Sequence, residues 1–118
     1  MSVQNYRDLL VWQRGMELVE AIYRVTAAWP QSEMCGLTNQ VRRAAVSIPA
    51  NIAEGQGRTG VREFLHHLSI ANGSLREVET LLLIAKRLQY LTGADCDAVM
   101  EQANQTGRLL LGLIRSLR

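Results

Sequence analysis

A basic residue, a hydroxyl, an amide and a carboxylate recur at helical spacing within one apolar stretch of this 118-residue chain. At about 100° per residue they share one stripe of a helix, and they are Arg43, Ser47, Asn51 and Glu54. Such a polar stripe can satisfy its own hydrogen bonds or face a polar partner. Ser74 and Glu77, from a later stretch, could join its last two members in a buried polar cluster. Clusters of this kind more often fix helix register than perform catalysis.

Motifs typical of enzymes are present only in part. Gly55–Gly60 reads G-x-G-x-x-G, but it follows an expected helix, whereas dinucleotide binding requires a preceding strand. We therefore predict a helix C-cap and a tight turn there. Glu63 and His66 form one E-x-x-H pair, and a di-iron bundle needs two such pairs plus two further glutamates. No nucleophile is paired with a histidine in a strained turn. The sequence thus predicts no catalytic residue, no metal site and no cofactor.

The basic residues are almost all arginine, and Lys86 is the only lysine. Arginine is favoured where planar, bidentate contacts to phosphate or carboxylate matter, although a GC-rich genome would produce the same bias. The formal net charge of +2 permits an anionic partner without demanding one.

Two groups of arginines are candidates for phosphate contacts. The first group lies around the polar stripe and comprises Arg42, Arg43, Arg58 and Arg62; the second lies near the C-terminus and comprises Arg108, Arg115 and Arg118. Backbone N–H groups at the start of a helix after Gly60 would also suit a phosphate. The alternative is an ordinary solvated face.

Four helices are expected to position these residues. The first ends because the residue before Pro30 avoids helical geometry. The second begins near Ser32, which we interpret as its N-cap, and the fourth is capped by Thr92 or Asp95. The expected spans are about Leu9 to Ala28, Ser32 to Gly55 or Gly57, Gly60 to Leu88, and from the turn at Tyr90–Gly93 to the C-terminus.

The apolar periodicity predicts the core. Pro49 lies inside the second helix, and because the apolar period continues on both sides we predict a kink rather than a break. The first and fourth helices each carry two apolar rows, which predicts a homo-oligomer built on those faces, with a broad core-facing stripe as the alternative. The cleanest heptad pattern is that of the third helix: Phe64, Leu68, Ala71, Leu75, Val78, Leu82 and Ala85.

Short connections between long helices, with no strand pattern, predict one domain spanning 1–118. Its expected architecture is an all-α, up-down-up-down antiparallel four-helix bundle. Cys35 and Cys96 are isolated and are expected to be reduced thiols without a metal or redox role. Neither a signal peptide nor a membrane-spanning run is apparent, so we expect a cytoplasmic protein that is not bound to a membrane.

Several segments together resemble one bacterial family, the four-helix bundle proteins encoded by intervening sequences within 23S rRNA genes and by standalone genes. The resemblance covers almost the whole chain. It is carried by Tyr6–Leu9 with Val11 and Trp12, Gln40–Pro49, Asn51–Gly55, Arg58, Glu63 and Phe64, Ile70 and Ala71, Gly73–Leu75, Glu77, Ile84 and Ala85, Leu88, and Tyr90 and Leu91.

The resemblance implies a bundle that assembles as a homo-oligomer, with a pentamer as the family precedent. Related bundles act as accessory factors to the reverse transcriptases of diversity-generating retroelements, which implies nucleic-acid and protein partners. We therefore expect a non-enzymatic, oligomeric bundle that binds RNA or DNA, with structured RNA preferred, through backbone phosphates. The rival hypothesis is a protein-docking scaffold or accessory subunit for a partner enzyme. An enzyme built on Asn51, Glu54 and Glu77 ranks last.

Overall fold

The computed structural model describes residues 5–118, and all regular structure in that range is helical. The four long helices are α1 (Leu10–Thr26), α2 (Leu37–Gln56), α3 (Val61–Arg87) and α4 (Gly93–Leu117). Two short 3-10 helices, η1 (Tyr6–Asp8) and η2 (Gln31–Glu33), precede α1 and α2.

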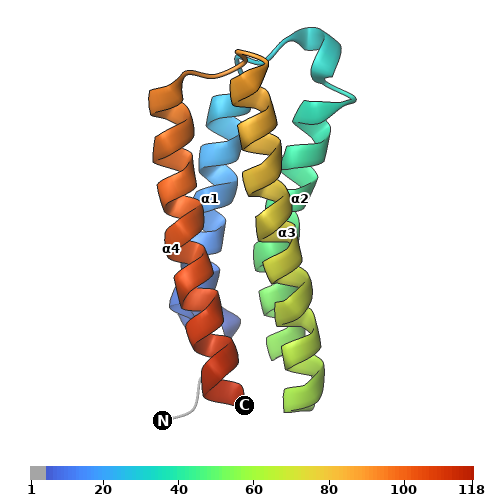
Figure 1. Cartoon of the computed structure of the whole chain (residues 1–118). Helices are drawn as coiled ribbons and strands as arrows, with labels where there is room; N and C mark the ends of the chain where they lie inside the picture. The colour runs from blue at the N-terminus through green and yellow to red at the C-terminus, as the bar shows by residue number, and fades with distance from the viewer. Residues whose placement is uncertain (1–4) are drawn as a thin grey trace.

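The helices run alternately up and down and form an elongated bundle of 45 × 25 × 20 Å (Figure 1). Each helix packs against the next one in the chain, and α4 closes the bundle against α1. The predicted antiparallel four-helix bundle is therefore confirmed. α1 and α3 begin, and α2 and α4 end, at the lower end of the bundle in Figure 1.

The core follows the predicted apolar period. On α3, all of the predicted heptad residues from Leu68 to Ala85 are buried, and Phe64 is half-buried. On α2, the helix continues through Pro49, which is itself buried, so the proline does not break it. Gly15 of α1 lies against that proline, since a Cβ placed on Gly15 would be 3.5 Å from Pro49 Cβ.

The start of α2 differs from the prediction. Ser32 does not cap the helix; it lies in η2, and the N-cap of α2 is Gly36, which has no side-chain cap. Glu33 supplies the missing acceptor, because its Oε1 accepts a hydrogen bond from the Leu37 N–H at 3.0 Å. Met34 precedes the helix and is exposed.

The turn from α3 to α4 packs against this same region. Tyr90 donates its hydroxyl hydrogen bond to Glu33 Oε2 at 2.8 Å, and its ring lies 6.0 Å from that of the buried Trp29. The Leu37 N–H and the Tyr90 hydroxyl lower the pKa of the Glu33 carboxyl, and the bond to Glu33 raises the pKa of Tyr90.

The ends of α3 and α4 have well-defined caps. Gln89 has φ 64°, and the N–H groups of Gln89 and Tyr90 donate to the carbonyls of Lys86 and Ala85. This is the Schellman arrangement, whose left-handed position usually holds glycine. Thr92 caps α4 as predicted, because its Oγ1 accepts from the Asp95 N–H at 3.0 Å.

Both cysteines are free, with Cys35 exposed and Cys96 buried in the first turn of α4. Burial raises the pKa of the Cys96 thiol. Among residues 5–118, no helix combines the length and the hydropathy that crossing a bilayer requires.

Candidate nucleic-acid interface

The polar stripe of α2 lies along the seam with α3, where most of its members are hydrogen-bonded. Ser47 Oγ and Ser74 Oγ are 2.8 Å apart, so the two hydroxyls share one hydrogen bond. Asn51 Nδ2 donates to the carbonyl and to the hydroxyl of Ser47, at 2.9 and 3.0 Å. Asn51 Oδ1 is 3.0 Å from His67 Nδ1 on α3. A chain of short contacts therefore ties α2 to α3 on one side of the core.

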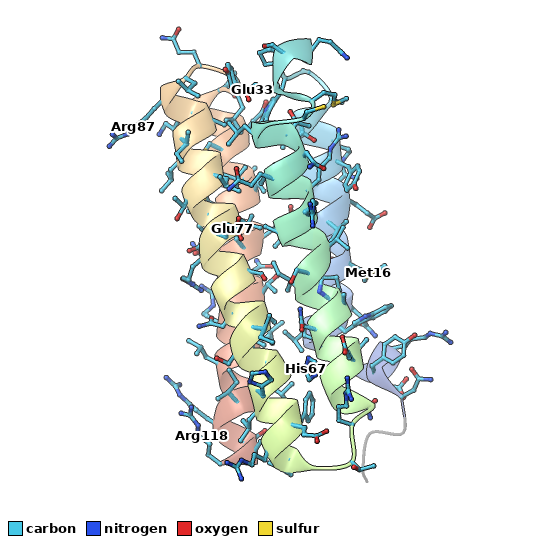
Figure 2. The ribbon with its side chains drawn as sticks, turned by 90° about the vertical axis from the view of Figure 1, so that its right-hand side faces the viewer. Met16, Glu33, His67, Glu77, Arg87 and Arg118 are labelled. Atoms are coloured by element: carbon cyan, nitrogen blue, oxygen red, sulfur yellow. The ribbon has the colours of Figure 1, made fainter. Side chains whose placement is uncertain are left out.

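The predicted four-residue cluster is only partly correct. Asn51 and Ser74 are half-buried and belong to the same network, whereas Glu54 and Glu77 are exposed. Glu77 contacts Gln40 instead, whose Nε2 lies 3.4 Å from Glu77 Oε2. The two carboxylates thus sit at separate places on the α2–α3 seam, and Figure 2 shows Glu77 well apart from His67 along α3.

His67 belongs to this hydrogen-bond network but is absent from the candidate residues predicted from the sequence. Its side chain is 13% exposed, and its Nε2 lies 4.0 Å from Glu54 Oε1. It precedes Ser74 by seven residues, which places both on the same face of α3. This seven-residue spacing is the sequence feature that could have placed His67 beside Ser74.

Gly55 allows the two helices to approach closely at this point. A Cβ on Gly55 would lie 2.6 Å from His67 Cβ and 3.1 Å from Phe64 Cδ1. The G-x-G-x-x-G segment forms the predicted C-cap and tight turn: Gly55 lies in the helix, Gly57 is its C-cap, and Gly60 is the N-cap of α3.

Five of the seven predicted arginines gather at one end of the bundle. The helix directions place Arg58 and Arg62 at the α2–α3 turn and the other three in the second half of α4, and Arg118 is labelled at this end in Figure 2. Two further arginines, from η1 and the first half of α1, lie in the same half. We call this set the basic end: Arg7, Arg14, Arg58, Arg62, Arg108, Arg115 and Arg118.

The acidic residues in the same half are fewer. They are Asp8, Glu17, Glu54 and Glu63. In the opposite half, from which Glu33 and Arg87 are labelled in Figure 2, the carboxylates slightly outnumber the basic groups. The mild overall charge therefore conceals a charge difference along the bundle.

A hollow of about 520 Å³ lies in the basic end, beside the α2–α3 turn. We call it the Arg58 hollow, and it is lined by Arg58, Arg62, Glu63, His66 and His67. Arg58 Nη2 donates to Glu54 Oε1 at 2.9 Å, whereas no ion pair of Arg62 is recorded within residues 5–118. α3 begins here, and its N-cap Gly60 offers no side-chain acceptor to the N–H groups of the first turn. Guanidinium groups and helix-start amides both favour an anion at this place.

The remaining predicted arginines have different settings. Arg42 is half-buried: its guanidinium stacks 4.5 Å from the Tyr23 ring centroid and its Nε donates to Thr26 Oγ1 at 2.9 Å. Arg42 thus holds α2 against α1, away from the basic end. Arg43 is exposed and lines a separate hollow of about 510 Å³ with Ser47 and Glu77.

Arg108 makes a loose ion pair, 3.6 Å from Glu101 Oε1, and it lines a surface depression with Arg14 of α1. The described residues, 5–118, hold no group of three or more side chains suited to a metal ion.

Comparisons with known proteins add the following. A family model described as 23S rRNA-intervening sequence protein matches residues 7–112. A solved protein with unknown function, from the S23 ribosomal protein family of Bacteroides thetaiotaomicron VPI-5482, has a TM-score of 0.83 against this chain. It is 22% identical, and the match covers 90% of this chain and 96% of that one, so it shows a shared fold. The comparison with curated proteins finds no match.

Proposed function

The chain belongs to the family of 23S rRNA-intervening sequence proteins, and from that premise we propose that it is a non-enzymatic bundle that binds structured RNA through backbone phosphates. The contacts would be made at the basic end, with Arg58 and Arg62 first and Arg108, Arg115 and Arg118 beside them. The protein would act in the cytoplasm, where such RNA is present.

The observation that carries this proposal is the arrangement of the arginines. Five of the predicted seven come from the α2–α3 turn, the start of α3 and the C-terminal half of α4 with its C-cap, and they lie at one end together with the uncapped start of α3. Guanidinium contacts to phosphate release condensed counterions and position the nucleic acid, but they do not read its sequence. Binding should therefore tolerate changes of base sequence and depend on shape and charge.

The experiment is fluorescence anisotropy of the protein with a labelled structured RNA, titrated across salt. We expect the affinity to fall steeply as salt rises. Arg58→Ala with Arg62→Ala should lower the slope of log Kd against log salt by about one unit per arginine.

A matched control keeps the net charge equal. Arg24 and Arg87 are exposed residues at the last turns of α1 and α3, at the other end of the bundle. Arg24→Ala with Arg87→Ala should leave the slope close to that of the wild type. Absence of RNA binding at low salt, or equal effects of the two double variants, would contradict the proposal.

The second candidate function is docking of a partner protein, such as an enzyme to which this bundle is an accessory subunit. It is favoured by exposed apolar side chains around a hollow of about 480 Å³ between α1 and α2, among them Tyr23, Met34 and Val46. A complex held there by apolar contacts would depend much less on salt than RNA binding does. Absence of RNA binding in the anisotropy series would favour this second function over the first.

A further inference from the structure

We infer that anion binding in the Arg58 hollow is linked to the uptake of a proton by His67; the inference rests on the phosphate-binding function proposed above.

The tautomer of His67 follows from the orientation of Asn51. A backbone carbonyl can only accept, so the contact with the Ser47 carbonyl identifies the Asn51 NH₂ group as the donor there. The Asn51 oxygen consequently faces His67, 3.0 Å from Nδ1. An amide oxygen also can only accept, so Nδ1 carries the hydrogen in the neutral ring.

The other ring nitrogen, Nε2, then holds the lone pair of the neutral imidazole. It lies at the wall of the Arg58 hollow, 4.0 Å from Glu54 Oε1. A phosphate oxygen approaching Nε2 would meet this lone pair and be repelled. Once Nε2 is protonated, the same approach becomes a charge-assisted hydrogen bond.

Glu54 marks a place that an anion can occupy. Its Oε1 accepts from Arg58 Nη2 at 2.9 Å and is also the oxygen 4.0 Å from His67 Nε2. One carboxylate oxygen therefore lies between the two groups that would hold a phosphate. Because the Glu54 side chain is 53% exposed, it can turn into solvent when a phosphate replaces it.

The charged and titratable groups around His67 come from α2, from α3 and from the turn between them. Within residues 5–118, the ion pair of α4 joins Arg108 to Glu101 and does not involve His67. Histidine is the side chain whose charge ordinarily changes between pH 5 and 8, and two histidines line this hollow. The groups around His67 are Glu54 of α2, Arg58 of the α2–α3 turn, and Arg62, Glu63 and His66 of α3, with the His66 ring centroid 5.8 Å away.

The test measures RNA affinity by anisotropy at pH 6.0 and pH 8.0, at constant ionic strength. The phosphodiester groups of RNA keep a single charge across this range, so they add no pH dependence of their own. The wild type should bind roughly fivefold more tightly at pH 6.0. His67→Gln should abolish that ratio. His66→Gln removes the other imidazole that lines the hollow and should retain most of the ratio.

The outcomes separate this inference from the proposed function. Salt-dependent binding of equal strength at both pH values would overturn the proton linkage and leave RNA binding intact. A pH ratio lost in His66→Gln but kept in His67→Gln would also overturn it. Absence of binding at low salt at both pH values would remove the proposed function and the linkage together.

Two further measurements do not depend on the stability of the His67→Gln variant. Calorimetry of RNA binding to the wild type, in two buffers of different ionisation enthalpy, gives the protons taken up, and a value of zero overturns the inference. Asn51→Asp places a carboxylate on Nδ1–H, which stabilises the protonated ring. The pH dependence of binding should then move to higher pH, which a purely structural role of Asn51 would not produce.

Discussion

At the scale of single residues, Gly55 controls how closely α2 and α3 can pack. A side chain there would meet the Cβ of His67 at 2.6 Å, and both atoms belong to rigid helix positions. The absence of a side chain at Gly55 therefore helps to bring Asn51 within hydrogen-bonding distance of His67.

Gly55→Ala should accordingly destabilise the bundle by about 1–3 kcal/mol, because the helices must move apart. Alanine is the better helix former by about 1 kcal/mol, so propensity alone predicts the opposite sign. Urea denaturation followed by circular dichroism measures the free energy of unfolding.

Gly73→Ala is the matched control for this measurement. Gly73 is exposed within α3, and a Cβ placed there would meet nothing within 4 Å. The substitution should stabilise the protein by about 0.5–1 kcal/mol. Equal effects at the two glycines would mean that the close approach at Gly55 is absent.

The residues that a single helix contributes to the candidate site could be predicted from the sequence, but the pairing between helices could not. Helical spacing placed Arg43, Ser47, Asn51 and Glu54 on one stripe. In the structure, Asn51 donates to Ser47 Oγ, and Glu54 lies 4.0 Å from His67. The partner residue, His67, was not predicted, because periodicity within a helix does not fix the register between two antiparallel helices. That register depends on the length of the turn and on the close contact at Gly55.

At the scale of elements, the start of α2 is held by tertiary contacts as well as by local sequence. Glu33 bridges the Leu37 N–H and the Tyr90 hydroxyl, so one carboxylate joins the beginning of α2 to the turn before α4. These two bonds hold the pKa of Glu33 below its ordinary value.

A lowered pKa in the folded state gives a definite pH dependence. The folded protein binds the Glu33 proton less readily than the unfolded chain, so the stabilisation is present above the ordinary glutamate pKa of about 4.3 and is lost as pH falls through the folded value. Glu33→Gln should lower Tm at pH 7, and the gap from the wild type should shrink toward pH 3. Thermal denaturation across this range measures it, and a gap that stays constant would contradict the role of the charge.

The four helices were predictable because each apolar seam repeats over several turns. The prediction failed at Ser32, which has the chemistry of an N-cap but lies in the short helix η2. The true start, at Leu37, follows a glycine without a capping side chain, and its acceptor comes from Glu33, four residues earlier. A sequence pattern alone does not show that tertiary contacts select this arrangement.

At the scale of the whole molecule, apolar side chains remain on the surface of the isolated chain. Three large ones are on α1, namely Leu10, Met16 and Tyr23, and α4 exposes Leu111. α3 also exposes several, including Leu83. The proposed homo-oligomer would cover the faces of α1 and α4.

The oligomer is tested by the mass of the particle in solution. By family resemblance, we expect about five copies of the 13.2 kDa chain. Met16→Glu and Leu111→Glu should each reduce the mass measured by light scattering, because a buried unpaired charge is costly. Leu83→Glu is the control on α3 and should leave the mass unchanged; a monomeric wild type would contradict the assembly.

The basic end contains arginine and no lysine, since the chain's single lysine, Lys86, lies in the last turn of α3 at the other end. Lysine acetylation, a common way for cells to cancel a positive charge, therefore has no target side chain at the basic end. Guanidinium groups also stay protonated across the biological pH range. The positive potential of this end is thus permanent under acetylation, and an acetyltransferase acting on Lys86 would increase the charge contrast between the two ends of the bundle.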